Sequence, residues 1–190
     1  MKNFTIAVFV ALAWSISLTS GVACAEQKVF IQNRLSKKCI DVRGQPGLTN
    51  EAPLQLWSCE WSGKGPGGSP TDQKWIITNG GFIKNAIATD KCIDVQGRPG
   101  LSNEAPLQLW DCEYSGTGPD NTPTDQRWII TPGGLIKNVL AGAANKCIDV
   151  KGTLGKEDGA PLQLWDCEFS GGSNDTKTDQ QWDLVPAKEP

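Results

Sequence analysis

The chain has 190 residues, of which 18 are basic and 21 acidic, and its net charge is −3. It has no basic stripe and no run of like charge, so we expect neither nucleic acid nor an anionic membrane surface as a partner. It also lacks histidine, which removes the commonest general base and the standard serine and cysteine triads, so the sequence predicts no enzyme.

Residues 1–25 have the pattern of an export signal. Lys2 gives a positive start, an apolar stretch follows, and a small-x-small site ends at Ala25. We therefore expect a secreted or periplasmic protein whose mature chain has 165 residues, the size of one domain. No membrane-spanning apolar run remains in it. A lipoprotein anchored through Cys24 is the alternative, although Gly21 stands where such signals usually carry leucine.

The mature chain, 26–190, is one unit written three times, over about 26–78, 79–131 and 132–190. Each unit opens with an apolar strand (FIQN, FIKN or LIKN), continues through CIDV and PLQLW, and ends at DQxW. Tight turns, β-branched positions and the absence of a helical period predict four short strands per unit in an all-β fold.

Six cysteines stand in pairs 20 residues apart, one pair in each unit. They are Cys39 and Cys59, Cys92 and Cys112, and Cys147 and Cys167. An even number of cysteines in an exported chain predicts three disulfides. Zinc is the competing use of cysteine, but the chain has no CxxC motif and no histidine, so we expect no metal site.

Three QxW motifs close the three units, at Gln73–Trp75, Gln126–Trp128 and Gln180–Trp182. Together with CIDV, LQLW and the paired cysteines, they resemble the ricin B-chain-type lectin family over essentially the whole mature chain. The resemblance implies a β-trefoil of three four-stranded lobes. It also implies a carbohydrate-binding protein without a cofactor, with up to three sites for galactose, N-acetylgalactosamine or another glycan. We expect the three QxW tryptophans to fill the core at the bases of the lobes.

Strand geometry places a candidate site in each lobe. Residues two apart share one face of a strand, so Asp41 lies on the face of Cys39 in CIDV, opposite the aliphatic face. If Cys39 lies directly opposite Cys59, antiparallel pairing places Asp41 opposite Trp57. A carboxylate accepts hydrogen bonds from neighbouring sugar hydroxyls, and an indole covers the C–H face of a pyranose. Gln55, on the same face, can bind at the rim.

The family's sugar site uses the aspartate of the first strand and the aromatic residue of LQLW. The resemblance therefore implies nine binding residues: Asp41, Gln55, Trp57, Asp94, Gln108, Trp110, Asp149, Gln163 and Trp165. Possible secondary residues stand just before QxW, at Asp72, Asp125 and Asp179. The family commonly has asparagine there, and an ionised aspartate cannot donate a hydrogen bond as asparagine does.

Other functions and partners stay open at this point. The second hypothesis is a β-trefoil inhibitor, or a targeting subunit of a toxin or enzyme, that uses its loops on a protein partner. Such modules often accompany glycan-degrading enzymes or toxins, so a separately encoded subunit is a candidate partner. We expect the first two sites to behave alike and the third to differ, because Lys151, Gly159 and a shorter spacing between cysteine and QxW occur only there.

Overall fold

The computed structural model describes residues 26–44, 48–97, 101–152, 156–169 and 178–188; the expected export signal and Cys24 lie outside these ranges. The described residues form twelve strands and three single 3-10 turns. The strands are β1 (Lys28–Asn33), β2 (Cys39–Val42), β3 (Leu54–Trp57), β4 (Lys74–Ile77), β5 (Ile83–Asn85), β6 (Lys91–Val95), β7 (Leu107–Asp111), β8 (Trp128–Ile130), β9 (Ile136–Asn138), β10 (Lys146–Val150), β11 (Leu162–Asp166) and β12 (Trp182–Pro186). The turns are η1 (Pro66–Gly68), η2 (Pro119–Asn121) and η3 (Gly142–Ala144).

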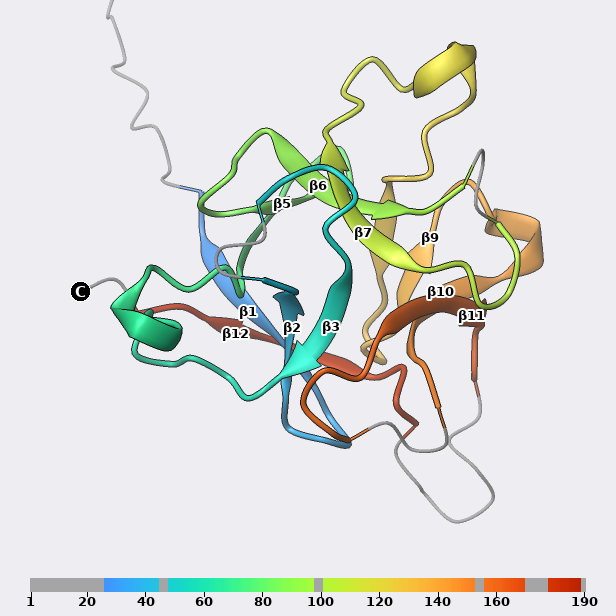
Figure 1. The fold of residues 1–190 in the computed structure, drawn as a ribbon. Coiled ribbons are helices and arrows are strands. Elements are labelled where there is room, and N and C mark those ends of the chain that lie inside the picture. Colours follow the sequence, from blue (N-terminus) through green and yellow to red (C-terminus); the bar gives the residue numbers. More distant parts are fainter. Residues whose placement is uncertain (1–25, 45–47, 98–100, 153–155, 170–177, 189–190) are drawn as a thin grey trace, which may run out of the picture.

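Six strands form a ring and the other six form three hairpins (Figure 1). In the ring, β1 pairs with β12 and β4, β4 pairs with β5, and β8 pairs with β9. A bridge between Phe82 and Arg127 joins β5 to β8, and the Trp182 amide donates to the Gly134 carbonyl at 2.9 Å beside β9. The hairpins are β2–β3, β6–β7 and β10–β11. This is the expected all-β trefoil of three four-stranded lobes.

The aliphatic faces of the hairpins make the core. In the first lobe Ile40, Val42, Leu54 and Leu56 are at most 1% exposed, and the same positions are buried in the other lobes. Strand alternation is the reason, because these residues share one face of CIDV and of LQLW. Each QxW tryptophan is also buried, as expected, and its indole N–H donates to the carbonyl of the isoleucine in CIDV, at 3.2 Å for Trp75.

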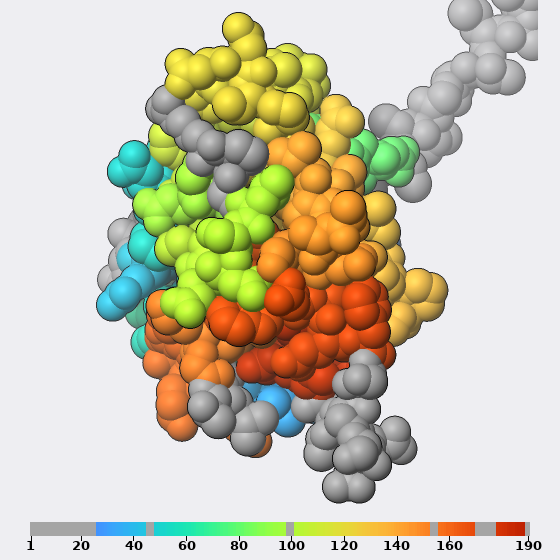
Figure 2. Space-filling model, turned by 90° about the vertical axis from the view of Figure 1, so that its right-hand side faces the viewer, coloured from blue at the N-terminus to red at the C-terminus, as the bar shows by residue number. Residues whose placement is uncertain are grey.

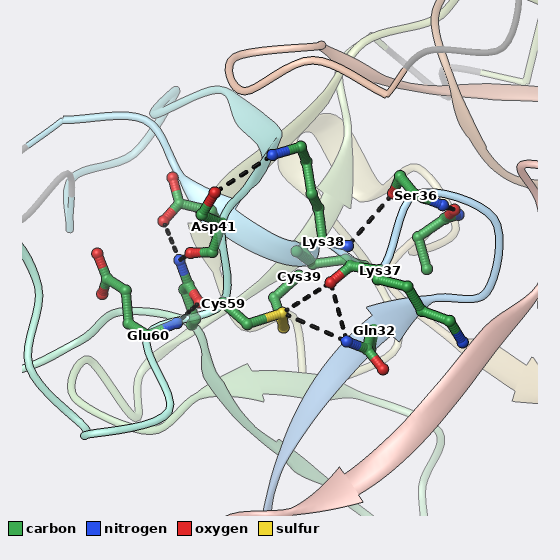
Figure 3. The surroundings of a disulfide bond; sticks show 12 residues. Gln32, Ser36, Lys37, Lys38, Cys39, Asp41, Cys59 and Glu60 are labelled. Carbon is green, nitrogen blue, oxygen red and sulfur yellow. Dashed lines mark hydrogen bonds between the residues drawn. A yellow bond between two sulfur atoms is a disulfide. The ribbon is translucent and has the colours of Figure 1, made fainter.

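All three disulfides form within their own lobes, as the spacing predicts, with Cα–Cα distances of 5.1, 5.0 and 5.0 Å. The expected register is wrong by two residues. Cys39 lies opposite Trp57, and Asp41 lies opposite Gln55. Because β3 ends at Trp57, Cys59 lies two residues beyond the strand and reaches Cys39 diagonally (Figure 3). The bridge therefore does not require direct opposition of the two cysteines.

The same displacement occurs in the other two lobes. There the aspartate of CIDV lies opposite the glutamine of LQLW, in the pairs Asp94–Gln108 and Asp149–Gln163. The tryptophan of LQLW lies opposite the first cysteine instead. Aspartate and indole are thus diagonal neighbours in every lobe rather than a directly opposed pair.

The loop before each LQLW strand pairs with the next lobe rather than with its own. The Glu51 amide donates to the Leu109 carbonyl of β7 at 2.9 Å, and the Leu109 amide returns a bond to Ala52. In the same way the Glu104 amide donates to the Leu164 carbonyl of the third lobe at 2.9 Å, and the Gly159 amide donates to the Leu56 carbonyl of the first lobe at 2.8 Å. The three hairpins are therefore joined in a closed cycle.

Candidate functional site

The first lobe contains a cavity of about 500 Å³ that brings together four of the predicted residues. Asp41, Gln55, Trp57 and Asp72 all line it. Trp57 is half-buried, so part of its indole is available beside the carboxylate. The segment between Cys59 and Gln73 supplies another part of the lining, through Pro66 of η1, Ser69 and Pro70.

Asp41 is held by two amides. It is 6% exposed and accepts hydrogen bonds from Gln55 Nε2 at 2.8 Å and from Gln73 Nε2 at 3.0 Å. Asp41 thus lies on the face opposite the aliphatic core, as strand alternation predicts, and it is buried there among the residues that line the cavity. Gln55 is also buried and orients Asp41, which corrects its expected place at the rim.

Gln73 is a site residue that the predicted set lacks. It is fully buried, its Oε1 accepts from the Glu60 amide at 2.9 Å, and its Nε2 also donates to the Ser58 carbonyl at 3.1 Å. These bonds fix the side-chain amide in one orientation, so that Nε2 always faces Asp41. The signal for this role is present in the sequence, because glutamine opens QxW in all three units.

Asp72 lies against Asp41, and the two carboxyl groups hydrogen bond to each other. Burial, together with the negative charge of Asp41, raises the pKa of Asp72 to about 8; burial also raises the pKa of Asp41. Two carboxyl groups this close cannot both ionise, so the pair holds one proton near neutral pH. A protonated carboxyl can donate a hydrogen bond, as the family's asparagine does in this position.

The second lobe repeats this arrangement around Asp94, which accepts from Gln108 Nε2 at 2.7 Å and from Gln126 Nε2 at 3.1 Å. Burial and the charge of Asp125 raise the pKa of Asp94 to about 7. A cavity of about 190 Å³ is lined by Asp94, Gln108, Asp125 and the half-buried Trp110. Its wall includes η2, in the long loop that stands out from the body of the molecule (yellow in Figure 2).

In the third lobe Asp149 accepts from Gln163 Nε2 at 2.7 Å and from Gln180 Nε2 at 3.1 Å. Burial and the charge of Asp149 raise the pKa of Asp179 to about 7. Trp165 is half-buried, and Gln163 Oε1 is buried without a hydrogen-bond partner in the described ranges. Residues 170–177, between Cys167 and Gln180, lie outside the described part of the chain.

The carboxyl pairs do not have the geometry of glycoside hydrolysis. Retaining enzymes hold two carboxyl groups roughly 5 Å apart across the sugar bond, whereas Asp41 and Asp72 are directly hydrogen bonded. Over the described residues, no group of three or more side chains is arranged to hold a metal ion. No helix in the same ranges is long and apolar enough to cross a membrane. The arrangement is suited to hydrogen bonding with a polar ligand that also has an apolar face.

Residues 27–182 match the ricin-type beta-trefoil lectin domain, and the chain belongs to this family. No curated protein matches the chain by sequence. The C-terminal half of an earthworm R-type lectin, solved in complex with GalNAc, is 19% identical with a TM-score of 0.58, over 84% of this chain and 98% of that one. The designed threefold-symmetric protein ThreeFoil is 24% identical with a TM-score of 0.57, over 83% and 97% of the two chains.

A third similar structure is the beta-trefoil lectin of the Vibrio vulnificus hemolysin/cytolysin, which has N-acetyl-D-lactosamine bound. It is 16% identical with a TM-score of 0.57, over 87% of this chain and 98% of that one. At these identities the structural likeness establishes the shared fold. The family and fold support carbohydrate binding by the chain.

Proposed function

We propose that the protein is a secreted lectin that binds glycans at the aspartate–indole sites of its lobes and carries out no chemistry of its own. The observation that carries this proposal is the cavity where Asp41 and Trp57 lie together, repeated around Asp94 and Trp110. Its disulfides form in an oxidising compartment, which supports export. The expected export signal supports it further.

The residues of one site have complementary tasks. Each oxygen of Asp41 accepts one glutamine amide, and the lone-pair direction that Asp72 does not occupy is open to a sugar hydroxyl. The proton shared by Asp41 and Asp72 becomes a donor to the sugar when the hydrogen bond between the two carboxyl groups is exchanged for one to the ligand. Trp57 covers the C–H face of the ring. The glutamine bonds set the Asp41 carboxylate before the ligand arrives, which lowers the ordering cost of binding.

The sugar we propose is of the galactose or N-acetylgalactosamine type. Bound GalNAc and N-acetyl-D-lactosamine in two similar structures support this choice. The likeness to an exo-beta-1,3-galactanase covers 84% of this chain but 30% of that protein. There the matching region is part of a larger enzyme, which supports the use of such a module to bring a separately encoded enzyme or toxin to its glycan.

A glycan array followed by calorimetry tests the proposal. We expect a monosaccharide Kd of around 1 mM, or about −4 kcal/mol, and binding about 100-fold tighter to a glycan-coated surface because several sites act together. Trp57→Ala and Trp110→Ala should each remove one site. Trp61→Ala is the matched control, because Trp61 is 51% exposed and packs edge-on against Phe30 at 4.9 Å.

Two results would contradict the proposal. One is an array without a bound glycan. The other is a protein target whose binding is unaffected by free sugar, which would favour the alternative of an inhibitor or a protein-directed targeting subunit. Equal loss of binding in Trp61→Ala and Trp57→Ala would place the site elsewhere on the lobe.

A further inference from the structure

The candidate sites of the first and second lobes are each bordered by a residue from the preceding lobe of the ring. Glu51 belongs to the first lobe but lines the cavity of the second. Gly159 belongs to the third lobe but lines the cavity of the first. The two residues occupy the same position, just before the APLQLW segment of their units, and Glu104 is the third equivalent. Gly159 therefore contributes to the first site. The sequence predicts a place for it at the third site instead, because Gly159 belongs to the third unit of the chain.

The backbone at this position favours glycine. Glu51 and Glu104 both have φ of +67°, and Gly159 has φ of +86°. A residue with a side chain pays a conformational cost of roughly 1 kcal/mol in this region, and such residues concentrate at functional sites. Glutamate at position 51, where glycine fits more easily, indicates a role for the side chain itself.

The cavities differ in size as this exchange predicts. The second lobe's cavity, bordered by Glu51, has about 190 Å³, whereas the first lobe's, bordered by Gly159, has about 500 Å³. Their charge differs as well. Arg43 lines the first cavity, and Gln96 stands at its place in the second. Asp158 also lines the first cavity, but Lys38 pairs with it at 2.7 Å.

From these differences we infer that Glu51 is a specificity-determining residue of the neighbouring lobe's site. It restricts the second site to a neutral terminal sugar, whereas the first site, bordered by Gly159 and Arg43, also admits a glycan extended by an acidic sugar. The inference rests on the proposed lectin function. It replaces the expectation that the first two sites behave alike.

The test uses lactose as the neutral probe and 6′-sialyllactose as its acidic extension. The indole N–H signals of Trp57 and Trp110 in a proton–nitrogen correlation spectrum report the two sites separately, with assignments from Trp→Phe variants. At each indole we take the Kd for sialyllactose divided by the Kd for lactose. We expect this ratio to be at least about fivefold larger at Trp110 than at Trp57, because one uncompensated negative charge at the edge of the site weakens the binding of an acidic sugar by about that factor.

Three substitutions separate size from charge. Glu51→Gly should lower the ratio at Trp110 by about fivefold or more, and Glu51→Gln should give an intermediate decrease because it removes the charge and keeps the size. Gly159→Glu should raise the ratio at Trp57. This substitution can be accommodated, since an added Cβ meets only Gln55 Oε1, at 3.9 Å, and Glu51 already adopts the required backbone.

Equal ratios at the two indoles in the unsubstituted protein would overturn the inference while leaving the lectin function intact. An unchanged ratio at Trp110 in folded Glu51→Gly would do the same. If lactose shifts neither indole signal, the proposed galactose-type site is itself wrong, and the inference fails with it.

Discussion

Replacing Gln73 by leucine should destabilise the first lobe more than the same change at Gln55. Leucine has a similar size but cannot form the hydrogen bonds that Gln73 makes with Asp41, Ser58 and Glu60. Each neutral partner left without a bond costs about 1 kcal/mol, and the bond to a buried carboxylate about 1.5 to 3 kcal/mol. The free energy of unfolding should therefore fall by about 3.5 to 5 kcal/mol.

The assay is equilibrium unfolding in guanidinium chloride with the disulfides intact, analysed by linear extrapolation. Gln55→Leu is the matched control. Within the described part of the chain Gln55 makes one side-chain hydrogen bond, to Asp41, so the same substitution there should cost about 1.5 to 3 kcal/mol. If Gln73→Leu costs less than Gln55→Leu, the amide of QxW does not hold the site together, and our account of the motif is wrong.

Three further predictions concern stability. Because the pKa of Asp72 is raised to about 8 from an ordinary value of 3.8, the folded protein keeps a proton that the unfolded chain has lost between about pH 4 and 8. Tm should thus fall as pH rises through this window, and Asp72→Asn should flatten the dependence; a Tm that rises over the same range contradicts the shared proton. Trp75→Ala should lower the free energy of unfolding by about 3 to 5 kcal/mol through a core cavity, and a loss below about 1 kcal/mol in a denaturant titration would place this indole outside the core. Replacing Cys39 and Cys59 together by serine should lower the free energy of unfolding by on the order of 3 kcal/mol, because the bridge closes a 20-residue loop. Calorimetric unfolding measures this loss, and an unchanged Tm would be inconsistent with the bridge.

The sequence predicts the fold and the disulfides because both depend on the repeat. A unit copied three times has to bury the same aliphatic face three times, and cysteines at one spacing pair within each copy. It also predicts that Asp41 and Trp57 lie on one face of the hairpin, because side chains two apart along a strand share a face. These inferences need only the periodicity of the chain.

The parts that could not be predicted depend on contacts between segments. The register fails because a disulfide tolerates a diagonal geometry, so Cys39 and Cys59 do not by themselves fix which residue opposes Asp41. The sequence also does not show which loop borders which lobe's site. Three nearly identical loops and three nearly identical strands do not reveal which loop lies on which strand, so only the structure places Glu51 at the second lobe's site.

The pairing of β1 with β12, in which Val29 lies opposite Pro186, has a consequence for how the repeats could be rearranged. In a linear repeat protein the outer units need special caps, because each end leaves an unpaired face. Here the first and last strands complete one ring, so every lobe has a neighbour on both sides. A circular permutant whose strands β12 and β1 are joined by a short linker, and whose new ends lie in the loop around η2, would keep every strand pairing described above. The break in the chain could thus be moved from one lobe to another without exposing a sheet edge.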